Sequence, residues 1–170
     1  MEWKQGLIAG IEARIFRVSF TGELSFEINV PSNFGLYIWN KLIEAGAEFD
    51  ITPYGTESMH ILRAEKGFII VGQDTVGSMS PTDMGMDWII KSNKDFSFLG
   101  ERSLMRADII REDRKQFVGL RTLNDEQVLP EGSQIVSSKK QIIPIKMEGH
   151  VTSSYFSACL GLPIALAMIK

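Results

Sequence analysis

The sequence predicts an α+β protein, in which a β-hairpin and two helices precede a group of short strands. Apolar and polar residues alternate on both sides of Gly22-Glu23, which is typical of two antiparallel strands that share one buried face. Two stretches with helical spacing follow, at residues 32–46 and 56–66. After residue 111 the pattern changes to short β segments, and strands at such intervals indicate a small barrel or sandwich.

The predicted hairpin places a carboxylate in the middle of its second strand. Its two strands carry the alternating apolar residues Phe16-Val18-Phe20 and Leu24-Phe26-Ile28-Val30. Glu27 shares the more polar face with Ser25 and Asn29, because its two neighbours point to the opposite face. Such a carboxylate either belongs to a solvated strand face or accepts hydrogen bonds from a planar ligand edge, such as an aminopyrimidine or guanidinium. The spacing alone leaves both interpretations open.

The first helix is predicted to begin with Ser32 as its N-cap and to end at Gly46. An apolar stripe on this helix is predicted to pack into the core, and consists of Leu36, Trp39, Leu42 and Ile43. Gly67 is predicted to stop the second helix, and buried strands are predicted at residues 68–71 and 84–90. The residues between these two strands have the composition of a loop.

A mixed charge run at residues 111–115 is interpreted as a boundary, so the predicted domains are residues 1–110 and 111–170. A short helix is expected around residues 103–105, before this boundary. The strands predicted beyond it are residues 116–121, 134–136, 142–147, 151–153 and 164–169. Turns are predicted between some of them, at Glu131-Gly132 and Glu148-Gly149.

Composition narrows the functional classes. A net charge of −3 gives no reason to expect nucleic acid or a membrane surface as a partner. The two histidines lie far apart without ligand spacing, and no glycine-rich nucleotide loop occurs, so we expect no metal site and no nucleotide site of those types. Cys159 is predicted to be a buried, inert thiol, and a single cysteine fits a reducing, cytoplasmic location.

The segment Phe20-Thr-Gly-Glu-Leu-Ser-Phe-Glu27 resembles the Tyr-Thr-Gly-Glu-x-Gly-Phe-Glu signature of the folate-dependent aminomethyltransferases, the T-proteins of the glycine cleavage system. In that family the aromatic residue and the last Glu contact the pterin of tetrahydrofolate. The resemblance therefore implies that Phe20 and Glu27 bind folate, although alternation places Phe20 on the core face with Phe16 and Val18. Trp88 falls where the family has a Trp near the folate, and a buried strand aromatic is the alternative.

Arg63 lies in the block Tyr54-Gly-Thr-Glu-Ser-Met-His-Ile-Leu-Arg-Ala-Glu-Lys-Gly67. It matches the second Arg of the T-protein pattern Gly-Ala-Arg-Asp-x-Leu-Arg-Leu-Glu-Ala-Gly and is a folate-binding candidate, whereas the first, folate-contacting Arg falls on Met59. An ion pair with a neighbouring acid is the structural alternative for Arg63. The block is also similar to the C-terminal domain of the α subunit of heterotetrameric sarcosine oxidase. So are Val71-Gly-Gln-Asp-Thr75 and Gly149-His-Val-Thr-Ser-Ser-Tyr155.

This resemblance implies an aminomethyltransferase-type folate domain followed by a small, incomplete β-barrel. In sarcosine oxidase a flavin on the β subunit oxidises sarcosine to an iminium, and the folate domain captures the one-carbon unit as 5,10-methylenetetrahydrofolate. The expected cofactor of this chain is thus tetrahydrofolate, with flavin and NAD only on other domains or subunits. The expected partners are other sarcosine oxidase subunits, missing chain segments, or a second copy.

The family's catalytic Asp lies far upstream of the pterin-binding Glu, and only 26 residues precede Glu27. We therefore expect part of an enzyme of the sarcosine oxidase type that lacks the catalytic acid in this chain. Two alternatives stay open at this point. One is a non-catalytic folate-binding or scaffold module, and the other is the folate domain of a different one-carbon demethylase, acting on dimethylglycine or a sulfonium compound.

Overall fold

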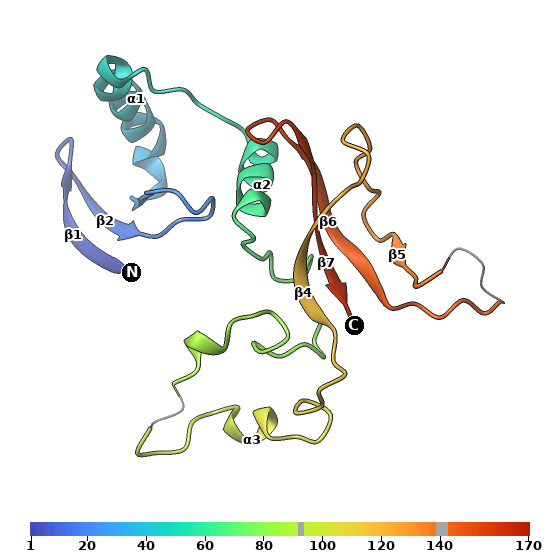
Figure 1. Ribbon diagram of the computed structural model, residues 1–170. Coiled ribbons are helices and arrows are strands. Elements are labelled where there is room, and N and C mark those ends of the chain that lie inside the picture. Colours follow the sequence, from blue (N-terminus) through green and yellow to red (C-terminus); the bar gives the residue numbers. More distant parts are fainter. Residues whose placement is uncertain (92–93, 139–142) are drawn as a thin grey trace. The chain divides into compact units, whose positions relative to one another are not determined.

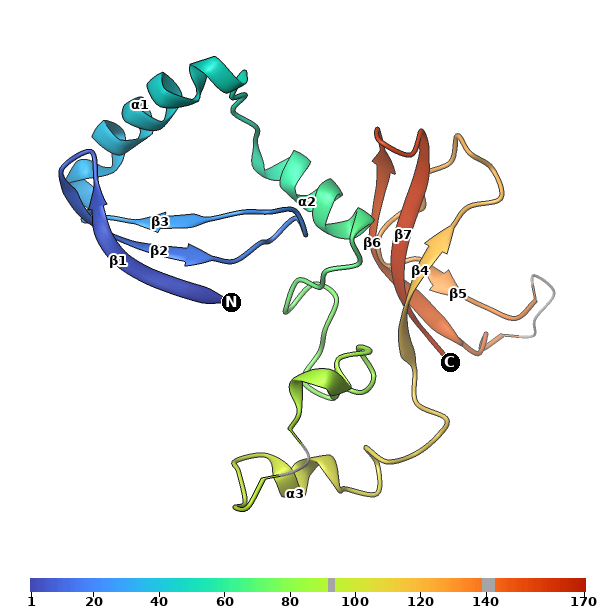
Figure 2. The ribbon, with the colours of Figure 1, turned by 60° about the vertical axis from the view of Figure 1, so that its left-hand side comes forward.

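A computed structural model describes residues 1–91, 94–138 and 143–170. The chain divides into two compact units, Met1–Phe68 and Ile69–Lys170, whose α-helices and strands are labelled in Figure 1 and Figure 2. The boundary predicted between residues 110 and 111 lies inside the second unit, and as a boundary between domains it stays a prediction.

The first unit contains a three-stranded antiparallel sheet in the order β1-β2-β3 (Figure 2). The strands are β1 (Glu2–Ile8), β2 (Ile11–Arg17) and β3 (Glu27–Asn29). Alternation in the sequence did not predict β1. Its turn into β2 has φ of 47° at Ala9 and 83° at Gly10, the two positive values that a type I′ hairpin turn needs.

The predicted pairing around Gly22 is confirmed, but its strands are shorter than alternation suggested. β2 pairs with β3 in a register that sets Arg14 opposite Asn29 and Phe16 opposite Glu27. Residues 18–26 form a loop between them. The Ser19 hydroxyl accepts a hydrogen bond of 2.8 Å from the Gly22 N–H, and such local side-chain bonds compete with a strand ladder.

The predicted N-cap of the first helix is wrong, but the predicted end of the helix at Gly46 is confirmed. Residues Ser32–Phe34 form a 3-10 turn, η1, without a side-chain cap, and α1 follows at Gly35–Gly46. The chain continues through Gly46 into a second 3-10 turn, η2 (Ala47–Phe49). The helical conformation ends at Asp50, because this residue is left-handed, with φ of 56°.

The predicted apolar stripe of α1 is not the buried side of the helix. Ile38 is 4% exposed, whereas Leu36 is 74% and Trp39 is 53% exposed. The helix lies beside the β1–β2 turn, where the Tyr37 hydroxyl donates a hydrogen bond of 3.2 Å to the Ala9 carbonyl oxygen. This helix has apolar residues on two sides, and only the side that packs against the rest of the unit is buried. The predicted stripe lies on the other side.

The second helix is confirmed as α2 (Thr56–Glu65), and Gly67 ends it with φ of 75°. The predicted strand at residues 68–71 is wrong, because turns follow the helix and Val71 is exposed. In the second unit, the predicted helix around residue 104 is confirmed as α3 (Glu101–Leu104).

The second unit contains a four-stranded antiparallel sheet in the order β4-β7-β6-β5. Its strands are β4 (Gln116–Arg121), β5 (Gln134–Ile135), β6 (Gly149–Ser157) and β7 (Leu162–Ile169), which confirms four of the five predicted strands. Residues 143–147 are not a strand, and residue 142 lies outside the described residues. The turn predicted at Glu148-Gly149 is wrong, because Gly149 opens β6.

Buried side chains of β6 and β7 form the core of this sheet: Val151, Ala165, Leu166, Ala167 and Met168. The sheet is half of a curled barrel, so the predicted α+β class with an incomplete barrel is confirmed. Cys159 lies in the turn between β6 and β7 and is exposed, which corrects the prediction of a buried thiol.

The predicted strand at residues 84–90 is wrong. Turns and a 3-10 segment, η3 (Asp87–Ile89), occupy this region, and a buried ion pair organises it. The Asp83 carboxylate is 2.7 Å from Arg114 Nε and 2.5 Å from Arg114 Nη2. It also accepts hydrogen bonds from the N–H and the hydroxyl of Ser80. Because Arg114 and Ser80 both donate to the Asp83 carboxylate, they hold this region as a loop, although its apolar residues are spaced as in a strand.

No helix in the described ranges is long and apolar enough to cross a bilayer. Within the same ranges, no three His, Cys, Asp or Glu side chains gather closely enough to hold a metal ion.

Candidate functional site

The sheet of the first unit has two unlike faces. Register and strand alternation place eight side chains on one face: Trp3, Gln5, Leu7, Glu12, Arg14, Phe16, Glu27 and Asn29. The opposite face carries Ala13, which is buried, and Ile15 and Ile28, which are half-buried. The first face, which we call the open face, therefore combines charged, amide and aromatic groups that are accessible to a ligand.

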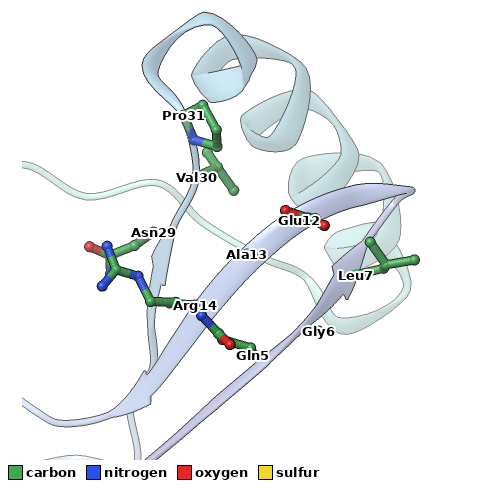
Figure 3. A pocket seen from close by; sticks show the side chains of 9 residues that line it. All are labelled: Gln5, Gly6, Leu7, Glu12, Ala13, Arg14, Asn29, Val30 and Pro31. Atoms are coloured by element: carbon green, nitrogen blue, oxygen red, sulfur yellow. The ribbon is translucent and has the colours of Figure 1, made fainter.

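A hollow of about 780 Å³ lies over the open face (Figure 3). Gln5, Leu7, Glu12, Arg14 and Asn29 line it from the open face, and Gly6, Ala13, Val30 and Pro31 complete the lining. Arg14 stands directly opposite Gln5 on β1 and Asn29 on β3. One cation, one carboxylate and two amides thus surround the hollow.

Glu27 lies next to this hollow, two residues along β3 from Asn29. Its side chain is exposed, and it makes no hydrogen bond or ion pair with any residue in the described part of the chain. The expectation that Glu27 and Asn29 share a polar face is confirmed by the register. The carboxylate is therefore accessible and has its hydrogen-bonding capacity available.

An aromatic pair stands beside Glu27 on the same face. Phe16 is directly opposite Glu27 across the β2–β3 ladder, and Trp3 is opposite Phe16 across the β1–β2 ladder. The rings of Trp3 and Phe16 are stacked, with centroids 6.4 Å apart and planes inclined by 27°. Sequence reasoning missed Trp3, because only the register of the unpredicted strand β1 places it next to Glu27.

Phe20 is not on this ladder. It lies in the loop between β2 and β3, is 41% exposed, and its ring centroid is 6.4 Å from that of His60 on α2. The core role suggested by alternation is wrong, because the chain leaves the strand at Arg17. Its folate contact stays a prediction.

Arg63 is fully buried, and its Nη1 donates a hydrogen bond of 3.1 Å to the Phe68 carbonyl oxygen. This bond holds the turn that follows α2. Trp88 belongs to η3 in the second unit and is exposed, so the alternative of a buried strand aromatic is wrong. The folate-binding roles of Arg63 and Trp88 stay predictions.

The structure brings together two motifs that the sequence holds far apart, residues 71–75 and 149–155. The buried Asp74 carboxylate accepts hydrogen bonds of 2.5 Å from Thr152 Oγ1 and 2.6 Å from Ser153 Oγ through its Oδ1. Its Oδ2 accepts a bond of 2.8 Å from the Ile70 N–H. Gln73 Nε2 donates to the same Ser153 hydroxyl, at 3.1 Å.

A β-bulge makes this arrangement feasible. Consecutive residues of a regular strand point to opposite faces, but the β6–β7 register shifts between Val151 and Ser153. Thr152 and Ser153 can therefore both reach one carboxylate oxygen. Neither motif alone predicted this cluster, because the bulge is a property of the paired strands.

Comparison with known proteins identifies the family. Residues 1–94 match the model of the GCVT N-terminal domain, which is more than half of the chain, and residues 115–170 match that of the glycine cleavage T-protein C-terminal barrel domain. The chain belongs to the glycine cleavage T-protein family.

Within this family the chain is similar to parts of longer proteins. It is 51% identical over 168 residues to sarcosine oxidase subunit alpha of Corynebacterium sp. (strain U-96), covering 96% of this chain and 17% of that protein. It is 28% identical over 168 residues to an aminomethyltransferase of Thermotoga petrophila, covering 99% of this chain and 43% of the relative. The chain thus spans less than half the length of either relative.

A solved structure confirms the T-protein fold. The crystal structure of the glycine cleavage system aminomethyltransferase T from Bartonella henselae superposes with a TM-score of 0.78 at 22% identity. The match covers 93% of this chain and 42% of that one.

Proposed function

We propose that this T-protein-family chain binds tetrahydrofolate and forms the one-carbon-accepting part of an enzyme of the sarcosine oxidase type. In the proposed reaction, a flavin on another domain or subunit would supply the oxidation of sarcosine to an iminium. The methylene carbon of the iminium then passes to tetrahydrofolate, which gives 5,10-methylenetetrahydrofolate and glycine. Similarity to sarcosine oxidase subunit alpha supports the choice of substrate, and the T-protein family supports folate.

The observation that carries the proposal is the accessible Glu27 carboxylate beside the hollow of the open face. A pterin presents an amino group and a ring N–H side by side, and an ionised carboxylate can accept both hydrogen bonds at once. The hollow offers room for the rest of the molecule, with Gln5, Arg14 and Asn29 as hydrogen-bonding groups. The residues present therefore fit the ligand.

Glu27 acts by orientation in this mechanism. Tetrahydrofolate, when bound, supplies the nitrogens N5 and N10 that take over the methylene carbon, while their two protons leave with glycine. Holding the pterin by its edge at Glu27 fixes the direction in which those nitrogens point, which is the contribution of a positioning carboxylate.

Replacement of Glu27 by Gln is expected to weaken tetrahydrofolate binding by more than ~1 kcal/mol, or about fivefold, because a charge-assisted hydrogen bond becomes a neutral one. Isothermal titration calorimetry measures this change. Glu2→Gln is the matched control, since Glu2 is exposed but lies on the opposite face of the sheet. Equal affinities of wild type and Glu27→Gln would refute the role of Glu27.

The catalytic part of the proposal needs a second experiment. The chain is mixed with the flavin-bearing subunits of a sarcosine oxidase, and formation of 5,10-methylenetetrahydrofolate from sarcosine is followed. We expect product only when the chain and the partner subunits are both present. Folate binding without any stimulation of product formation would instead identify a binding module that takes no part in turnover.

A further inference from the structure

We propose that Trp3 and Phe16 form the stacking surface on which the planar pyrimidine ring of a reduced pterin lies, with its donor edge toward Glu27. This inference rests on the proposed function and adds two ligand-binding residues to it. Trp3, which belongs to a strand that alternation did not predict, is the critical member of the pair.

The three side chains form a row across the sheet. Trp3, Phe16 and Glu27 are successive partners in the registers of β1 with β2 and β2 with β3. Directly opposite residues on one sheet face have Cβ atoms about 4.5–5.5 Å apart. The carboxylate therefore stands at the border of the aromatic surface, close enough to bind the edge of a ring that lies on it.

The exposure of Trp3 is the second part of the argument. Its side chain is 62% exposed although it stacks on Phe16, so the outward surface of the pair is accessible. Aromatic faces attract planar heterocycles, and removal of one such platform commonly weakens the binding of a stacked base by about fivefold to a hundredfold. An accessible aromatic surface next to a carboxylate suits a ligand ring that has a polar donor edge.

The hollow extends the same site along the strands. Gln5 and Arg14 lie two residues from Trp3 and Phe16, which corresponds to about 7 Å along a strand. A substituent of the ring would thus lie over amide and cationic groups, and the Glu12 carboxylate lies a further two residues along β2. An elongated ligand with one planar end and a polar tail fits this order of groups.

Fluorescence provides a direct test, because the chain has only three tryptophans. In the Trp39→Phe/Trp88→Phe variant the emission comes from Trp3 alone. Titration with 6-methyltetrahydropterin, which has the pterin edge but no folate tail, and with tetrahydrofolate should quench this emission saturably. Because Trp88 is itself a folate-binding candidate, the midpoints should agree with the dissociation constants that calorimetry gives for this same variant. Binding by calorimetry without any change in Trp3 emission would overturn the proposal.

Trp3→Leu is expected to raise the dissociation constant of both ligands about tenfold, and Trp3→Phe by less, because part of the stacking surface is retained. Trp39→Leu is the matched control: Trp39 is comparably exposed but lies on α1, and it should leave both constants unchanged. Unchanged thermal unfolding, measured by circular dichroism, shows that each variant is folded.

The outcomes separate this inference from the proposed function. If Glu27→Gln weakens binding but Trp3→Leu does not, the stacking surface is wrong and folate binding stands. If wild type binds neither ligand, both proposals fall. If Trp3→Leu and Trp3→Phe both lower the melting temperature, and Trp3 emission does not change with ligand, the aromatic pair only stabilises the fold. That result would overturn the inference.

Discussion

Replacement of Asp83 by Asn is expected to lower the free energy of unfolding by about 3–5 kcal/mol, the usual cost of breaking a buried ion pair. The Asp83 side chain is 2% exposed, and Arg114, its partner, is 19% exposed. An Asn would leave the Arg114 charge poorly compensated and would place an amide N–H₂ where Arg114 or Ser80 now donates. Urea unfolding followed by tryptophan fluorescence measures the loss.

The matched control is Asp125→Asn. Asp125 pairs with Arg121 at 3.4 Å, but both side chains are more than half exposed. Exposed ion pairs contribute about 0–1 kcal/mol, so this variant should unfold nearly as wild type does. Equal losses in Asp83→Asn and Asp125→Asn would show that the Asp83 pair does not organise the loop.

The same carboxylate gives the stability a pH dependence of defined sign. Burial opposes ionisation of Asp83, but the Arg114 guanidinium and the Ser80 donors outweigh it, so the pKa of Asp83 is lower than its ordinary value. The stabilisation is complete above the pKa of the unfolded chain, about 3.9, and is lost as the pH falls through the lower folded pKa. Wild type should therefore lose stability below about pH 4 more steeply than Asp83→Asn.

Local sequence patterns predicted those helices and strands whose own residues carry a clear periodicity or apolar run. α2 has regular helical spacing and a glycine stop, and β4 and β7 contain short apolar runs. The patterns failed at residues 68–71 and 84–90, where apolar residues suggest strands. There the conformation is set by contacts from distant positions, such as Arg114, which lies 31 residues from Asp83.

In the candidate site, too, relations within one segment were predicted and relations between distant segments were not. Alternation was enough to place Glu27 and Asn29 on one face of a strand, because that relation depends on one segment only. The neighbours of Glu27 on the other strands depend on register, which a single segment does not contain. Phe16 and Trp3 were therefore missed, and Phe20 was assigned to the strand although the chain had already entered the loop.

Asp74→Asn is the other substitution for which we expect a large effect, a loss of about 3 kcal/mol in the free energy of unfolding. Asp74 is 1% exposed, and hydrogen bonds to a charged acceptor contribute about 1.5–3 kcal/mol each. The Thr152 and Ser153 hydroxyls can still donate to the remaining carbonyl oxygen. The new amide group, however, would face the Ile70 N–H, so two donors would meet at a buried position.

Asp87→Asn is the control for this change, because Asp87 also accepts a hydroxyl hydrogen bond, of 2.6 Å from Thr82, but at an exposed position. Urea unfolding should show a loss of less than about 1 kcal/mol there, since water replaces the lost bond. Hydrogen exchange locates the effect within the fold: the Ile70 amide should exchange faster in Asp74→Asn and unchanged in Asp87→Asn. Unaltered exchange at Ile70 would mean that Asp74 does not hold this loop against β6.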